Sequence, residues 1–151
     1  MGQIIRVSEA AAIAMHSAII LAHERPNSVS LGELAEILQS SRAHCSKVLQ
    51  RLCKSGLLEA IRGPKGGYVL SKDPAEVTLL QFYEAIEGRL EDTWCLFGEQ
   101  RCRFGFACCL FEKKLTKANE LIRSALGITL DEGTKECCSA LESFLPAKDQ
   151  R

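Results

Sequence analysis

Apolar residues recur at helical spacing over residues 9–24, where isoleucine and leucine stand among several alanines. This period predicts a helix, and the alanines permit close packing of its neighbours. The apolar run over residues 10–22 contains His16 and Ser17, and it falls short of the roughly 20 residues that a membrane-spanning helix needs. We therefore expect a buried helix of a soluble protein.

Two shorter helical patterns follow, at residues 30–38 and 42–54, separated by the turn sequence "QSSR". Ser30 and Glu33 have the spacing of a capping box at the start of the first. Gly56 follows the second where a left-handed residue ends a helix. The second pattern has one apolar face, made of Cys45, Val48, Leu49 and Leu52. Two helices joined by a tight turn predict a helix-turn-helix.

Two strand-like runs, "LLEAIRG" and "GYVLS", come next and are separated by "GPKGG". The proline and glycines suit the tip of a hairpin. We expect this hairpin to be the wing of a winged helix-turn-helix.

The second half of the chain predicts further helices. Thr78 and Gln81 mark the start of an amphipathic helix that stops at Gly88. Residues 89–108 predict a loop. Residues 109–126 are helical again, with an apolar stripe of Leu110, Leu115, Ala118, Leu121, Ile122 and Ala125 closed by Gly127. A long helix that extends from a small domain must bury its apolar stripe against another surface, and we expect a second copy of the chain to provide that surface.

These elements predict a mainly α fold with a small β-wing: a winged helix-turn-helix plus a long dimerisation helix. We divide the chain into a DNA-binding domain (1–88), a cysteine-rich loop (89–109), a dimerisation helix (109–132) and a C-terminal tail (133–151). Residues 129–145 predict one more short helix, in part within that tail.

Composition narrows the class of protein. The chain has 151 residues, zero formal net charge and 8 cysteines. No signal peptide pattern opens it, so we expect a cytoplasmic protein without a membrane partner, in which thiols stay reduced. Clustered cysteines there point to metal or redox chemistry more than to disulfides. Residues 30–72 hold seven Lys/Arg against three Glu, a basic island in a neutral chain.

The basic island predicts how the protein reads double-stranded DNA. The second helix of the pair presents polar and basic side chains to the major groove. Arg51, one turn on, is placed for a backbone phosphate, and the wing carries Arg62 and Lys65 beside a rigid Gly-Pro turn that suits the minor groove. The major-groove candidates are Ser41, Arg42, His44, Ser46 and Lys47. The alternatives are a solvated helical face and a plain surface hairpin.

The segments "LAEILQSS", "VLQRLCKSGLL" and "RGPKGGYVLSKDPAEVTLLQFYEAIEG", with the spaced cysteines after them, resemble the IscR/NsrR-type (Rrf-two) family of iron-sulfur winged-helix regulators. The resemblance covers residues 5–132. It implies a homodimeric repressor that crosses two long helices and binds a near-palindromic operator. It also implies an iron-sulfur cluster that senses redox state, oxygen, nitric oxide or cluster supply.

Cys95 and Cys102 match the first two cluster ligands of that family. The third ligand is either Cys109 or Cys108. Cys109, which we favour, fits the register of the following helix, whereas Cys108 keeps the family's usual gap of five residues after the second cysteine. The cluster that the resemblance implies has two or four irons, and thiolates are the usual ligands of such clusters. A zinc site is the chemical rival, although close C-x2-C pairs are missing from this loop.

A fourth ligand is implied by the same resemblance. The position three residues after the third cysteine carries Glu112, which is either that ligand or an exposed helix residue. The first-helix position that supplies an acidic ligand in some members carries Ala12, with Glu9 nearby. Cysteines elsewhere fall on the core face or the tail: Cys45, Cys53, Cys137 and Cys138.

Two further function classes remain open. One is a thiol-redox or zinc-binding winged-helix protein, or an accessory factor in iron-sulfur cluster assembly, against which the basic wing argues. The other is an enzyme, but no nucleophile-base pair, phosphate loop or paired-carboxylate cleft stands in the sequence. We expect a regulator without catalytic turnover.

Overall fold

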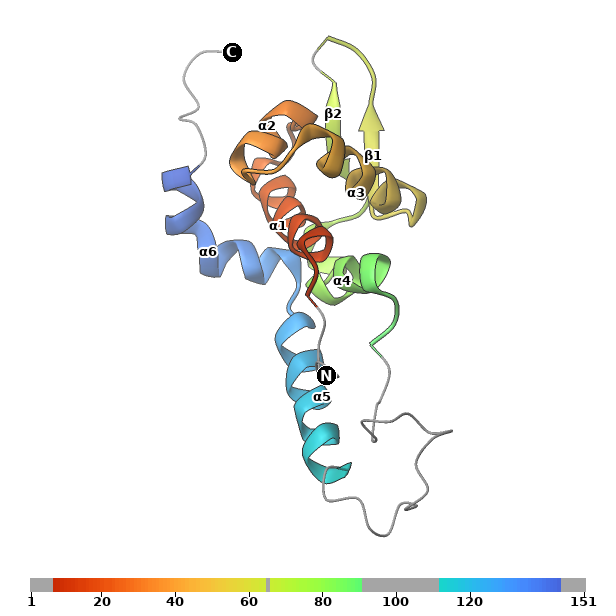
Figure 1. The fold of residues 1–151 in the computed structure, drawn as a ribbon. Coiled ribbons are helices and arrows are strands. Elements are labelled where there is room, and N and C mark those ends of the chain that lie inside the picture. Colours follow the sequence, from red (N-terminus) through yellow and green to blue (C-terminus); the bar gives the residue numbers. More distant parts are fainter. Residues whose placement is uncertain (1–6, 65, 91–111, 145–151) are drawn as a thin grey trace.

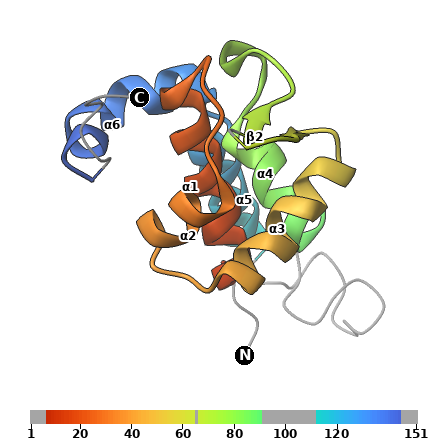
Figure 2. The ribbon, with the colours of Figure 1, turned by 90° about the horizontal axis from the view of Figure 1, so that it is seen from above.

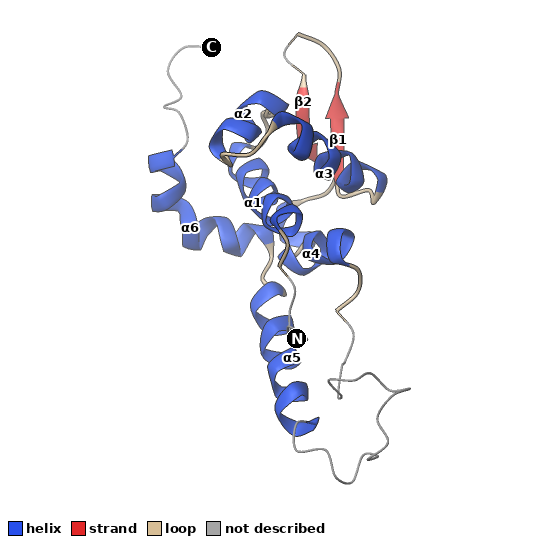
Figure 3. Cartoon of the chain, in the orientation of Figure 1, coloured by secondary structure: helices blue, strands red, loops and turns tan. Residues whose placement is uncertain are grey.

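The computed structural model describes residues 7–64, 66–90 and 112–144. The described residues form helices, one 3-10 turn and a two-stranded antiparallel sheet (Figures 1 and 3). In chain order the elements are α1 (Glu9–Glu24), α2 (Leu31–Ile37), α3 (Arg42–Lys54), β1 (Leu58–Ile61), β2 (Gly67–Leu70), η1 (Pro74–Glu76), α4 (Leu79–Glu87), α5 (Glu112–Leu126) and α6 (Leu130–Phe144). The predicted mainly α fold with a β-wing is confirmed.

Helix α1 is the centre of the core. Ala11, Ala14 and Ala18 are completely buried, because α3, α4, α6 and β2 all pack on this helix. Seen from above, α1 lies between α6 on one side and α3 and α4 on the other (Figure 2). Ser8 caps the helix by accepting a hydrogen bond from the Ala11 amide at 3.2 Å. Within the described ranges, no helix combines the length and apolarity needed to cross a bilayer.

The helix-turn-helix forms as its local signals predict. The Ser30 hydroxyl accepts from the Glu33 amide at 3.2 Å, and the Glu33 carboxylate accepts from the Ser30 amide at 2.9 Å. Ser41 caps α3 by accepting from the amide of His44 at 3.2 Å. Gly56 has a φ of +73°, the left-handed conformation expected after α3.

The wing is anchored at its base. Leu58 pairs with Leu70 in the antiparallel register, and both side chains are buried. Tyr68 also pairs with Val29 on its other side, since each residue donates its amide to the other's carbonyl at 2.9 and 3.1 Å. The hairpin is therefore joined to the segment before α2 as well as to its own partner strand.

Helix α5 leaves the winged-helix body as an arm, and α6 returns to pack on α1 (Figure 1). The junction pairs with the start of α4: the Leu79 amide donates to Ile128 at 3.2 Å, and the Leu130 amide donates to Val77 at 2.9 Å. Leu130 has no exposed surface. The last helix lies within the range 129–145 that the sequence predicted, and its first turn therefore belongs to the core.

Replacement of Leu130 by alanine should destabilise the whole domain by about 2–5 kcal/mol, because a fully buried side chain leaves a cavity. Urea unfolding followed by circular dichroism measures this. Ile61→Ala is the control, since Ile61 is 49% exposed, and it should cost at most about 1 kcal/mol. Equal stability of Leu130→Ala and the parent would show that α6 is not part of the cooperative unit.

Candidate nucleic-acid interface

Helix α3 separates its residues into a buried and a polar face. The buried face holds Cys45, Val48, Leu49 and Leu52 against the core. On the other side Ser41, Arg42 and Lys47 are exposed, while His44 and Ser46 are half-buried. The candidates for base and phosphate contacts therefore lie on the face of α3 that a DNA duplex could reach.

Contacts within the protein already orient some of these side chains. The Arg42 guanidinium lies over the first turn of α2, so that a Cβ added at Gly32 would come within 3.1 Å of its Nη2. His44 Nδ1 lies 3.4 Å from a carboxylate oxygen of Glu9 at the start of α1. Gln50 donates to the Ser46 hydroxyl at 3.2 Å.

The glycines of the wing are required by close backbone approaches. A Cβ at Gly66 would overlap the carbonyl oxygen of Ile61, and one at Gly67 would lie 2.6 Å from the carbonyl carbon of Val29. Gly63 has a φ of +125°, which side-chain-bearing residues rarely adopt. Arg62 is exposed beside this turn. Lys65, the second predicted wing contact, lies outside the described residues.

Arg51 has a set of contacts that the sequence did not suggest. Its Nη2 donates to the carbonyl oxygens of Ile86 at 2.8 Å and Ala85 at 3.2 Å, at the C-terminus of α4. These bonds compete with the phosphate contact predicted for this residue. A local sequence pattern could not have predicted these bonds, because they depend on the packing of α3 against α4.

The predicted metal ligands Cys95, Cys102, Cys108 and Cys109 lie outside the described residues. Glu112 is the first residue of α5. In residues 7–64, 66–90 and 112–144, no three His, Cys, Asp or Glu side chains are grouped to hold a metal ion.

The described cysteines outside that segment have separate environments. Cys45 is completely buried, as expected for a core residue. Cys53 is half-buried, and burial together with the nearby Glu59 carboxylate raises the pKa of its thiol, so it stays protonated at neutral pH. Cys137 is exposed on α6, and Cys138 follows it in the sequence.

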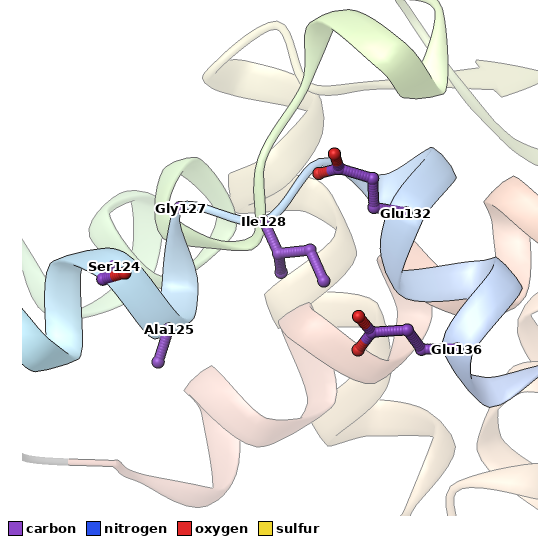
Figure 4. A pocket seen from close by; sticks show the side chains of 6 residues that line it. All are labelled: Ser124, Ala125, Gly127, Ile128, Glu132 and Glu136. Carbon is purple, nitrogen blue, oxygen red and sulfur yellow. The ribbon is translucent and has the colours of Figure 1, made fainter.

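An open hollow of about 590 Å³ lies between the end of α5 and the start of α6 (Figure 4). Ile128 and the carboxylates of Glu132 and Glu136 point toward it (Figure 4). Glu132 accepts hydrogen bonds from the amide and the hydroxyl of Thr129, which lower the pKa of its carboxyl. This carboxylate therefore takes part in the cap of α6.

Comparison with known sequences identifies similar transcriptional regulators. Residues 7–134 match the family model described as "Rrf2: Iron-dependent Transcriptional regulator". The HTH-type transcriptional regulator IscR of Xenorhabdus nematophila is 31% identical over 114 residues, which are 75% of this chain and 68% of that protein. IscR of Photorhabdus laumondii is 31% identical over 86 residues, so the matched part spans about half, 52%, of that relative.

Solved structures of similar proteins have the same fold. T. potens IscR has a TM-score of 0.71 at 25% identity, with 90% of each chain covered. CymR, the global cysteine regulator of B. subtilis, has a TM-score of 0.73 at 20% identity, covering 87% of this chain and 98% of CymR. The likeness to CymR concerns the fold alone.

Replacement of Gly67 by alanine should break the pairing of Tyr68 with Val29, because the new Cβ meets backbone atoms that cannot move aside. We expect a loss of roughly 1–3 kcal/mol in unfolding free energy and faster hydrogen exchange of the Tyr68 amide. Glu59→Ala, on the paired strand, is the control and should leave that amide protected. An unchanged Tyr68 exchange rate in Gly67→Ala would contradict the proposed anchoring of the wing.

Proposed function

Because the chain belongs to the Rrf2 family of transcriptional regulators, we propose that it is a cytoplasmic homodimeric repressor whose DNA binding is controlled by an iron-sulfur cluster. DNA binding and transcriptional regulation follow from the family and from the winged-helix fold. Its relatives are regulators and not enzymes. The observation that supports DNA binding is the polar face of α3 next to the wing. Gly67 of this wing packs directly against the backbone of Val29.

The DNA contacts would come from two elements. Side chains at the start of α3 would reach base edges and backbone phosphates at the major groove: Ser41, Arg42, His44, Ser46 and Lys47. Arg62, with Lys65, would enter the minor groove from the wing, where a narrow groove attracts cations. The small sheet that carries Arg62 is anchored through Val29, so little conformational freedom is lost when the wing binds.

The proposed dimer uses α5. Leu115 is buried, while Leu121 on the same helix is 72% exposed. An exposed leucine on an amphipathic arm indicates that α5 has apolar surface left for another chain. A second copy would suit a near-palindromic operator, since a two-fold dimer presents two equivalent α3 helices.

The proposed cluster ligands are Cys95, Cys102 and Cys109, with Cys108 as the alternative third thiolate and Glu112 as the fourth ligand. The donor set fits the group, because thiolates are the usual ligands of two-iron and four-iron clusters. When bound, such a cluster supplies a centre that responds to redox change, oxygen or nitric oxide. The chain itself supplies the ligands and holds Leu90, the last described residue before the cysteines, against α5 through a hydrogen bond from Arg123.

Anaerobic purification with iron, sulfide and zinc counted per chain tests the cluster. Cys109→Ala should abolish the visible absorption, whereas Cys108→Ala should keep nearly full iron content, because neighbouring helical side chains diverge by about 100°. Cys95→Ala and Cys102→Ala should lose the cluster, and Glu112→Ala should keep the colour but change its stability in air.

The opposite result for the two adjacent cysteines would make Cys108 the third ligand. Zinc in place of iron and sulfide would favour the alternative of a zinc-binding winged-helix protein. A parent protein without any bound metal would reject the cluster.

Arg62→Ala should weaken binding to an operator selected from random sequence by about 1–3 kcal/mol, because it removes a cation from the minor groove. Fluorescence anisotropy at several salt concentrations measures the loss, and circular dichroism checks the fold. Lys114→Ala, an exposed residue on α5, is the control and should bind like the parent. Equal affinities of Arg62→Ala and the parent would reject the wing contact.

A further inference from the structure

The C-terminus of α4 is the point where three other elements are tied together. Its carbonyl oxygens at Ala85 and Ile86 accept from Arg51 of α3. The side chain of Glu87 accepts from the amide of Ser8, the cap of α1, at 3.1 Å. The next residues of the chain contact α5. All of these contacts lie in residues 85–90, at the end of α4 and the start of the cysteine-rich segment.

The contacts of Arg51 have the chemistry of a helix cap. The last carbonyls of an α-helix have no partner within the helix and carry the negative end of its dipole. A guanidinium that donates to them makes charge-assisted bonds, which are stronger than neutral ones. The bond to Ile86 is short at 2.8 Å. Arg51 thus joins the last turn of the DNA-reading helix to the end of α4.

The exit from α4 is held on its other side as well. Gly88 ends the helix with a φ of +90°, and its amide donates to Glu84 at 3.0 Å. The Leu90 amide donates to the Glu84 carboxylate at 3.1 Å, and the Leu90 carbonyl accepts from Arg123 of α5. Leu90 itself is buried in the core cluster. Leu90 is therefore bonded, through the Glu84 side chain, to the same end of α4 whose carbonyls accept from Arg51.

We propose that Arg51 is a positioning residue, which sets α3 on α4 and couples the DNA-reading helix to the start of the cysteine-rich segment. It acts through the protein and does not contact DNA phosphate. The coupling to a cluster rests on the proposed function, whereas the positioning role does not.

Salt dependence separates a positioning residue from a phosphate contact. A lost phosphate contact reduces the slope of log affinity against log salt by about 0.9. Lys47→Gln, an exposed residue on the same helix, should show that reduction. Arg51→Gln should lower operator affinity by about three- to tenfold while the slope stays that of the parent. A slope reduced in Arg51→Gln as much as in Lys47→Gln would overturn the proposal.

Hydrogen exchange gives a second readout that does not involve DNA. Arg51→Gln should speed exchange of the Gly88 and Leu90 amides, since the end of α4 loses its cap, while Lys47→Gln should not. Arg51→Lys keeps the charge but ends one bond closer to the backbone, so it should keep the salt slope and still speed this exchange. Unchanged protection in both Arg51 variants would overturn the positioning role.

The coupling is tested by operator affinity with the cluster reconstituted and after anaerobic removal of iron. The ratio of the two affinities should fall toward one in Arg51→Gln and Arg51→Lys but not in Lys47→Gln. If the parent protein binds the operator equally well with and without the cluster, cluster control is rejected, and the coupling with it. The salt slope and the hydrogen exchange still decide the positioning role in that case. If the Arg51 variants respond to cluster removal as strongly as the parent does, the coupling alone is rejected.

Discussion

The structure depends on the burial of α1 on nearly every side. Three alanines of α1, at positions 11, 14 and 18, are completely buried, and their small side chains allow α3, α4 and α6 to approach α1 closely. Larger side chains there would separate these helices, because a close-packed core cannot absorb added volume without strain. The position of α3 is therefore set from behind, by small buried residues of α1.

The wing, the arm α5 and the end of α4 are anchored to this body by different contacts. The wing is short, yet its base is joined to Val29 and its glycines permit backbone contacts that a Cβ would prevent. The C-terminal end of α5 is fixed where the junction between α5 and α6 pairs with residues Val77–Leu79. Between these two regions, the end of α4 bonds to α1 and α3, and the chain that follows it bonds to α5.

Local chemistry explains why the elements were predictable. The capping box at Ser30, the cap at Ser41 and the left-handed Gly56 act within a few residues of chain, so their sequence patterns are sufficient. The polar face of α3 follows from its period in the same way. The apolar stripe of α5 was less informative, because Leu115 is buried while Leu121 is exposed, and periodicity alone does not say which neighbour covers each position.

The sequence by itself determined the approximate ranges of the helices and strands, the winged helix-turn-helix and the polar face of α3, since each depends on neighbours in the chain. Only the tertiary structure decided that α6 joins the core through Leu130, that Gly67 must lack a Cβ because Val29 passes beside it, and that Arg51 caps α4. The physical reason is distance along the chain: these contacts join residues more than thirty positions apart, and their partners are selected by packing around α1.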